Sequence, residues 1–202
     1  MRLGLFGGSF DPVHYAHLLL AECCREQQRL DRVLFLPAAA PPHKLGRELT
    51  PAEMRIDMLQ LAIAGHEQFA VSRQEADRGG VSYTIETLRH FRSEDPRHEL
   101  FLLVGADMLH DLPRWREAAE VCRLAVPLVA RRPGVKEPDF QCLEGIASAE
   151  RIEVFRQHQV EVPQVDLSST EIRRRVAAGL SIRYRTPRAV EKYIETHGLY
   201  RP

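Results

Sequence analysis

Net charge is the first thing that this sequence of 202 residues lacks, because its 28 lysines and arginines balance 28 aspartates and glutamates. Long apolar runs are also missing: none approaches the roughly 18–20 residues that cross a bilayer. The apolar run at the start of the sequence is too short and too interrupted by glycine to be a secretory signal. These absences argue against a general nucleic-acid coat and against a membrane protein. We expect a cytoplasmic protein that binds neither nucleic acid nor membranes.

Cysteine is scarce, and the four residues (Cys23, Cys24, Cys122 and Cys142) show no C-x-x-C spacing. In a chain of this length they are typical of reduced thiols in a cytoplasmic protein. A zinc site would need all four thiolates, and we predict no metal site built from protein ligands. Internal repeats and low-complexity tracts are absent as well.

What the sequence does contain is an alternation of short apolar runs with helical patterns. This alternation predicts an α/β fold with a mostly parallel sheet and helices on both faces. The expected strands are residues 2–6, 33–37, 69–72, 100–104, 125–130, 152–155 and 160–162, and the expected helices are residues 15–28, 51–64, 84–92, 168–178 and 186–197. We expect one domain over residues 1–202, with a small helical and basic C-terminal part from about residue 168.

Two helix starts have clear capping signals. Thr50 is a predicted N-cap, with Pro51 at the first helical position and Glu53 completing a capping box. Ser168 and Glu171 have the same S-x-x-E spacing.

A glycine turn at the end of the first strand is the strongest sign of a ligand site. Ligands bind at the carboxyl ends of strands in open α/β sheets. Gly7 and Gly8 permit positive φ and a close approach of backbone N–H groups to an anion. The following helix adds the partial positive charge of its N-terminus. His14 and His17 are three residues apart, so both face one side of that helix and can donate N–H groups to a phosphate.

The turn and the histidines also have simpler explanations when they are taken alone. The run does not fit the dinucleotide fingerprint G-x-G-x-x-G. The glycines could form an ordinary tight turn, and the histidines could be surface residues or half of a metal site. The complete run GGSFDPVHYAH at the first strand favours phosphate binding.

This run resembles the signature of the nucleotidyltransferases that have an H-x-G-H motif, with Ala16 at the position of the family glycine. Further segments resemble bacterial nicotinate-nucleotide adenylyltransferases in the same order along the chain. They are PPHK (41–44), SYTIETL (82–88), GAD (105–107) with Leu112 and Trp115, RPG (132–134) and SSTEIR (168–173). The resemblance covers nearly the whole chain and implies a Rossmann-like fold.

Each of these segments has a physical reason to act in a site and a simpler structural alternative. Lys44 can meet a phosphate as a point charge, or it can be a solvated surface lysine. Ser82 or Thr84 can cap the next helix and leave N–H groups for a carboxylate. Trp115 can stack on a heteroaromatic ring or belong to the core. Asp107 could bind ribose hydroxyls or a metal-bound water, or cap its helix.

The hydroxyl-rich helix start near residue 168 can form an anion site. Ser169 and Thr170 supply hydroxyls and N–H groups, and Arg173 follows one turn later. The alternative is an ordinary helix cap with a solvated basic face.

The resemblance implies transfer of the adenylyl group of ATP to nicotinate mononucleotide in NAD biosynthesis. It implies catalytic roles for His14, His17, Lys44 and Arg173. The implied ATP-binding residues are Gly7, Gly8, Ser9, Phe10, His14, His17, Gly105, Asp107, Ser169, Thr170 and Arg173. The implied mononucleotide-binding residues are Asp11, Lys44, Ser82, Tyr83, Thr84, Trp115 and Arg132.

Mg²⁺ is the implied cofactor, held mainly by the ATP phosphates. Two alternatives stay open: a phosphopantetheine adenylyltransferase, and a non-catalytic module that only binds nucleotides. The sequence leaves self-association into a homo-oligomer open.

Overall fold

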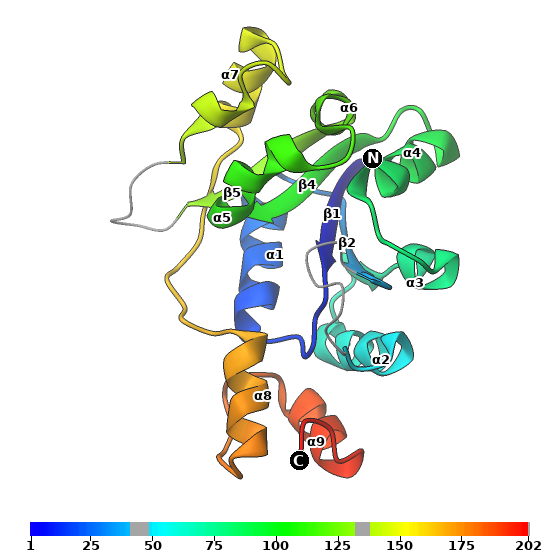
Figure 1. The fold of residues 1–202 in the computed structure, drawn as a ribbon, viewed down its shortest axis with the longest axis vertical. Coiled ribbons are helices and arrows are strands. Elements are labelled where there is room, and N and C mark those ends of the chain that lie inside the picture. Colours follow the sequence, from blue (N-terminus) through cyan, green and yellow to red (C-terminus); the bar gives the residue numbers. More distant parts are fainter. Residues whose placement is uncertain (41–48, 132–137, 202) are drawn as a thin grey trace.

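The computed structural model describes residues 1–40, 49–131 and 138–201, and within α5 it leaves the side chains of residues 106 and 107 undescribed. Its centre is one sheet in the order β3-β2-β1-β4-β5-β6, in which every neighbouring pair is parallel (Figure 1). The strands are β1 (Arg2–Gly8), β2 (Arg32–Pro37), β3 (Phe69–Val71), β4 (Glu99–Gly105), β5 (Ala125–Arg131) and β6 (Val160–Glu161). This strand order is that of a doubly wound Rossmann sheet, and it confirms the predicted α/β fold.

Helices cover both faces of this sheet. They are α1 (Tyr15–Gln27), α2 (Ala52–Ile63), α3 (Gln74–Arg78), α4 (Thr84–Glu94), α5 (Ala106–Asp111), α6 (Ala118–Leu124), α7 (Ala149–Gln157), α8 (Ser169–Ala177) and α9 (Arg188–Thr196), with short 3₁₀ turns η2 (Leu112–Arg114) and η3 (Phe140–Leu143).

The alternation of side chains along β4 explains why two layers of helices form. Leu100 and Leu102 point into one apolar core, which α4, α5, α6 and α7 cover. Phe101 and Leu103 point into a second core, which α1, α2, α8 and α9 cover. Successive residues of a strand face opposite sides, so a strand buried on both faces is a continuous apolar run.

One predicted strand is wrong, because residues 152–155 belong to helix α7. Ser148 caps this helix by accepting a hydrogen bond from the backbone N–H of Arg151 at 3.3 Å. Ile152 and Phe155, three residues apart, are the buried side chains, which is helical and not strand spacing. The short helices α3, α5 and α6 were not predicted.

The predicted caps are partly right. Ser168 caps α8 by accepting a hydrogen bond from the N–H of Glu171 at 3.2 Å. The N-cap of α2 is Pro51 and not Thr50. The predicted cap differs by one residue, and the N–H of Thr50 instead donates to Asp11 Oδ2 at 3.4 Å.

The C-terminal helices α8 and α9 lie beyond the carboxyl end of β1 (Figure 1). The α9 helix is anchored on α2, where the Tyr193 hydroxyl donates to Asp57 Oδ2 at 2.7 Å. A hydrogen bond from Ser169 Oγ to the carbonyl of Pro12 places the start of α8 near the glycine turn. Across the described ranges, no helix has both the length and the apolar character needed to span a bilayer.

Candidate active site

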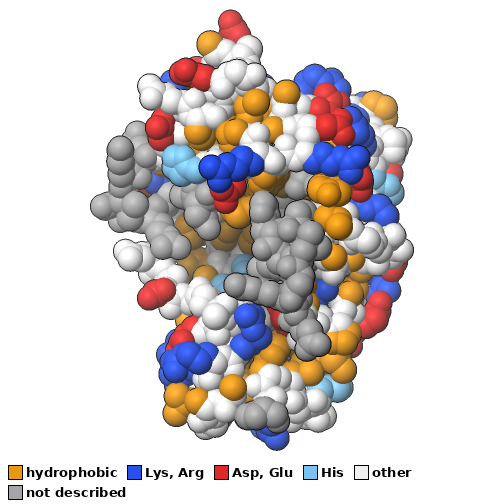
Figure 2. Space-filling view, viewed as in Figure 1, with side chains coloured by type: hydrophobic (Ala, Val, Ile, Leu, Met, Phe, Trp, Pro, Cys, Tyr) orange, Lys and Arg blue, Asp and Glu red, His pale blue; other side chains and the backbone are white. Residues whose placement is uncertain are grey.

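A cavity of about 1180 Å³ opens at the carboxyl ends of β1 and β4. The strand order reverses direction between these two strands, which is the usual ligand position in such sheets. Figure 2 shows a hollow near the middle of the molecule, with lysine and arginine side chains above and below it. The predicted site residues that line the cavity are Gly7, Gly8, Ser9, His14, His17, Ser82, Tyr83, Thr84, Gly105, Trp115, Ser169, Thr170 and Arg173.

The turn after β1 is built around the buried ring of Phe10. Neither Gly7 nor Gly8 has positive φ, and the left-handed residue is Phe10 at φ 47°. The expected reason for the glycines is therefore wrong in this respect. A Cβ on Gly8 would lie 2.9 Å from Phe10 Cζ, so Gly8 lets the ring pack directly beneath the turn. Phe10 is 1% exposed and meets the ring of His17 edge-on at 5.1 Å.

The two histidines form a stacked pair at the start of α1. Their ring centroids are 3.6 Å apart, and the rings are inclined by 19°. The backbone N–H of His14 donates to Nδ1 of His17 at 3.3 Å. This hydrogen bond assigns neutral His17 the tautomer that carries its proton on Nε2.

His14 is the more buried ring of the pair, with 5% exposure. Burial lowers the pKa of its imidazole from the ordinary value near 6.5 to about 4. Its Nδ1 has no hydrogen-bond partner among the described residues. At neutral pH the free site therefore has an uncharged His14 that can donate one N–H group.

This burial predicts a pH dependence of stability. The unfolded chain binds a proton at His14 below about pH 6.5, whereas the folded chain does so only below about pH 4. The free energy of unfolding should therefore fall as the pH drops through this window and be unaffected above it. Between pH 7 and pH 5, urea unfolding of wild type should show a loss about 2 kcal/mol larger than that of His14→Gln. Equal losses in the two proteins would contradict the burial of a neutral imidazole.

The start of α8 is bonded directly to the loop that joins the glycine turn to α1. Ser169 Oγ donates to the carbonyl of Pro12 at 2.8 Å, and Arg173 Nη1 donates to the carbonyl of Asp11 at 2.6 Å. Arg173 Nη2 also donates to Thr170 Oγ1 at 3.3 Å. Two segments about 160 residues apart in sequence thus line one wall of the same cavity, with donors that suit phosphate oxygens.

The other end of the cavity is lined by aromatic residues. Tyr83 is the N-cap of α4, and Trp115 follows η2 with its indole Nε1 buried and unpartnered among the described atoms. Neither Ser82 nor Thr84 caps α4 with its side chain, so that expectation is wrong. Ser82 Oγ instead accepts from the N–H of Ala39 at 3.0 Å and holds the start of α4 against the end of β2.

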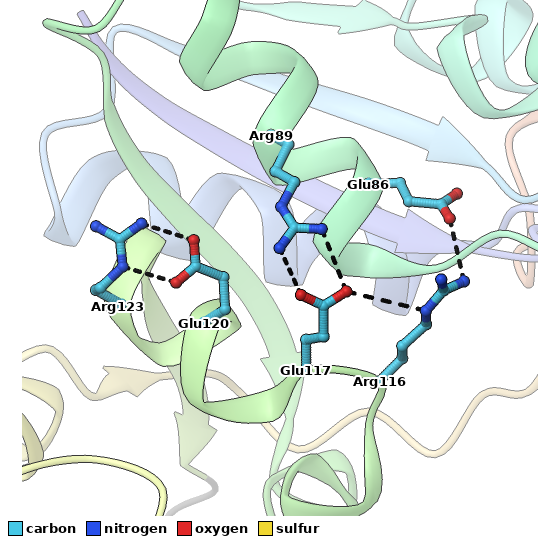
Figure 3. Close-up of polar contacts among 6 residues, drawn as sticks. All are labelled: Glu86, Arg89, Arg116, Glu117, Glu120 and Arg123. Carbon is cyan, nitrogen blue, oxygen red and sulfur yellow. Dashed lines mark hydrogen bonds and ion pairs between the residues drawn. The ribbon is translucent and has the colours of Figure 1, made fainter.

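A network of ion pairs between α4 and the residues just before α6 lies next to this aromatic end. Figure 3 shows its side chains. The guanidinium of Arg116 lies 4.7 Å from the centre of the Tyr83 ring and pairs with Glu86 at 3.3 Å. Glu117, next in the chain, pairs with Arg89 of α4. The network joins α4 to the turn before α6, and it places a positive charge beside Tyr83.

The remaining predicted residues are not on the described wall. Asp11 is 2% exposed, and its carboxylate accepts from the Tyr200 hydroxyl at 2.6 Å and from the N–H of Thr50 at 3.4 Å. It supports the loop after the turn from behind. Lys44 and Arg132 lie outside the described residues, as does the side chain of Asp107.

Two buried charged residues at the site are not predicted by the sequence pattern. Arg55 is 1% exposed and lies behind the glycine turn. Glu75 is 6% exposed, lines the cavity, and accepts from Thr87 Oγ1 at 2.7 Å; burial raises its pKa. Both occur in charged stretches that are typical of solvated helix faces, so the sequence offers no signal for their burial.

The doubly wound sheet, with a wall of N–H, hydroxyl and guanidinium donors at its switch point, is typical of nucleotide-binding α/β proteins. The chain belongs to the cytidylyltransferase-like family, whose model matches residues 5–175. It is 48% identical over 200 residues to the "Probable nicotinate-nucleotide adenylyltransferase" of Thermomicrobium roseum, covering 99% of this chain and 92% of that relative. It is also 48% identical over 201 residues to the protein of the same name from Thermus thermophilus, covering all of both chains. Within the family it therefore groups with the nicotinate-nucleotide adenylyltransferases.

A solved structure shares the fold at low sequence identity. The Plasmodium falciparum nicotinic acid mononucleotide adenylyltransferase complexed with NaAD matches with a TM-score of 0.78 and 17% identity. The match covers 98% of this chain and 97% of that one.

Proposed function

We propose that this chain transfers the adenylyl group of ATP to nicotinate mononucleotide, giving nicotinate adenine dinucleotide and pyrophosphate. The observation that supports this most is the single cavity wall shared by the glycine turn, the histidine pair and the start of α8. A wall of N–H, hydroxyl and guanidinium donors fits a polyphosphate, and the aromatic end of the cavity fits a pyridine ring.

The reaction needs no protein nucleophile. The 5′-phosphate oxygen of the mononucleotide attacks the α-phosphorus of ATP, and the bond from that phosphorus to the bridging oxygen breaks. The bonding pair leaves with pyrophosphate. Since the attacking phosphate is already an anion, no proton has to be removed. The difficulty is to bring two anions together, so catalysis consists of positioning and charge stabilisation.

The donors of the shared wall supply that stabilisation. His17 donates from Nε2 to the triphosphate, because its Nδ1 already accepts from the backbone of His14. His14 donates its one N–H group, and the negative charge of a bound triphosphate raises its pKa. The Ser169 hydroxyl already donates to Pro12, so Ser169 contributes its backbone N–H, and together with Thr170 and Arg173 it holds the β- and γ-phosphates. Lys44 remains the predicted partner of the attacking phosphate.

The acceptor binds at the aromatic end. Trp115 stacks on the pyridine ring, and the N–H groups at the start of α4, next to Tyr83, receive its carboxylate. Arg116 adds a positive charge at the same end. Glu86 offsets part of this charge. The N–H groups at the start of α4 favour the carboxylate of nicotinate over the uncharged amide of nicotinamide.

Mg²⁺ enters as part of the ATP substrate. The glycine turn, the histidine pair and the start of α8 contribute no carboxylate to the cavity, whereas Mg²⁺ is usually held by carboxylate and phosphate oxygens and water. We therefore propose that ATP phosphate oxygens and water hold the ion.

Pyrophosphate release from ATP with a panel of acceptors tests the proposal. We expect turnover with nicotinate mononucleotide, and a kcat/KM about 10- to 100-fold lower with nicotinamide mononucleotide, the cost of losing a charge-assisted interaction. Equal values would contradict the specificity. Turnover with phosphopantetheine alone would assign the chain to that reaction. ATP binding without pyrophosphate release from any acceptor would indicate a non-catalytic module.

A further inference from the structure

Arg55 of α2 makes an unusual set of contacts directly behind the glycine turn. Its Nε, Nη1 and Nη2 donate to the carbonyl oxygens of Thr50, Ser9 and Ala38, each at 2.8 Å. These carbonyls belong to three segments: the loop before the Pro51 N-cap of α2, the turn after β1, and the residue that follows β2. Burying a guanidinium costs several kcal/mol, and here neutral carbonyls rather than a bonded carboxylate take its hydrogen bonds.

The contact to Ser9 fixes how the turn faces the cavity. The carbonyl of Ser9 points back to Arg55, and the carbonyl of Gly8 points back to the N–H of Ala38 at 2.9 Å. The Gly8–Ser9 and Ser9–Phe10 peptide bonds are trans. In a trans peptide the N–H points opposite to the C=O. The N–H of Phe10 therefore points away from Arg55, and the N–H of Ser9 points away from Ala38. Gly8 and Ser9 line the cavity.

We infer that Arg55 is a positioning residue for adenylyl transfer: it turns the backbone N–H groups of the β1 turn toward the substrate phosphates. This inference rests on the proposed function. Arg55 also places a positive charge behind the turn, and the buried carboxylate of Asp11, which accepts from the N–H of Thr50, offsets part of that charge. Successive backbone N–H groups backed by a fixed cation form an anion-binding concavity.

Substitution of Arg55, with a matched arginine as control, tests the inference. Arg92 also donates only to backbone carbonyls, those of Pro96, His98 and Leu124, and it does not line the cavity. Arg55→Lys and Arg92→Lys each keep the charge but lose the planar fork that reaches three acceptors. Arg55→Met and Arg92→Met also remove the charge.

We expect both lysine variants to lower Tm. At a temperature where circular dichroism shows both to be folded, only Arg55→Lys should lower kcat, by about 10- to 100-fold, which is the cost of slightly misplaced donors. It should also weaken ATP binding measured by calorimetry at least about tenfold, and Arg55→Met should weaken it further. A folded Arg55→Lys with kcat and ATP affinity within twofold of wild type would overturn the inference. Arg92 variants should stay within twofold.

A measurement on wild type makes the test independent of variant folding and of turnover. Inorganic pyrophosphate should shift the ¹H–¹⁵N resonances of Ser9 and Phe10, because these N–H groups would bind the anion. Unmoved resonances at saturating pyrophosphate would overturn the role of Arg55. Shifted resonances without pyrophosphate release from ATP in any acceptor assay would keep this anion site and reject the proposed reaction instead.

Discussion

His17→Ala is expected to lower kcat for adenylyl transfer by about 10²–10⁴-fold, the range for removal of one charge-stabilising donor. The ring is stacked on His14, in contact with Phe10 and bonded at Nδ1, so its Nε2–H has a fixed direction. A donor held in place before the reaction stabilises the charge on the departing pyrophosphate without reorganisation. Single-turnover measurement with saturating ATP and nicotinate mononucleotide gives the rate of the chemical step.

His197→Ala is the matched control for this experiment. That ring also stacks on an aromatic residue, Tyr193 at 4.0 Å, but it lies after α9 and does not line the cavity. Its kcat should stay within about twofold of wild type, as for a surface substitution. A near-native rate for His17→Ala would remove this ring from the mechanism.

The sheet could be predicted from the sequence because its strands are buried on both faces. The run Leu100–Val104 is apolar at every position. A short run of this kind is typical of a central parallel strand that is buried on both faces. The pattern of residues 152–155 predicts a strand because Ile152 and Val154 are alternate residues, although Ile152 and Phe155 also have the three-residue spacing of a helix. Tertiary packing of Ile152 and Phe155 decides in favour of the helix.

The sequence predicts the site residues that belong to a recognisable motif, but not a buried side chain that supports the turn from behind. Glycines, a histidine pair and a serine-threonine helix start leave a pattern in the sequence, and the structure brings these segments to one cavity. Arg55 looks like any charged residue on a helix face. Its three acceptors come from residues 5, 17 and 46 positions away, so only the folded chain reveals its role.

Arg173→Met is expected to lower kcat/KM for ATP by about 10²–10³-fold, as removal of a fixed cationic donor from a phosphate site does. Arg173 lines the cavity and also holds the carbonyl of Asp11. Its loss would therefore remove the proposed phosphate donor and loosen the contact between α8 and the turn loop. Arg173→Lys should recover only part of the rate, because an ammonium group cannot hold the carbonyl and a phosphate with the same planar geometry.

The next residue in the chain provides the control. Arg174 is also a guanidinium on α8, but it pairs with Glu171 at 2.7 Å and its side chain is 63% exposed. Arg174→Met should therefore change kcat/KM by less than about twofold, since exposed ion pairs contribute little. Charge alone cannot separate the two variants, because both remove one positive charge from the same helix. Equal losses would mean that α8 acts through its general field, whereas a loss confined to Arg173→Met would show that the contact with the turn and the triphosphate is specific.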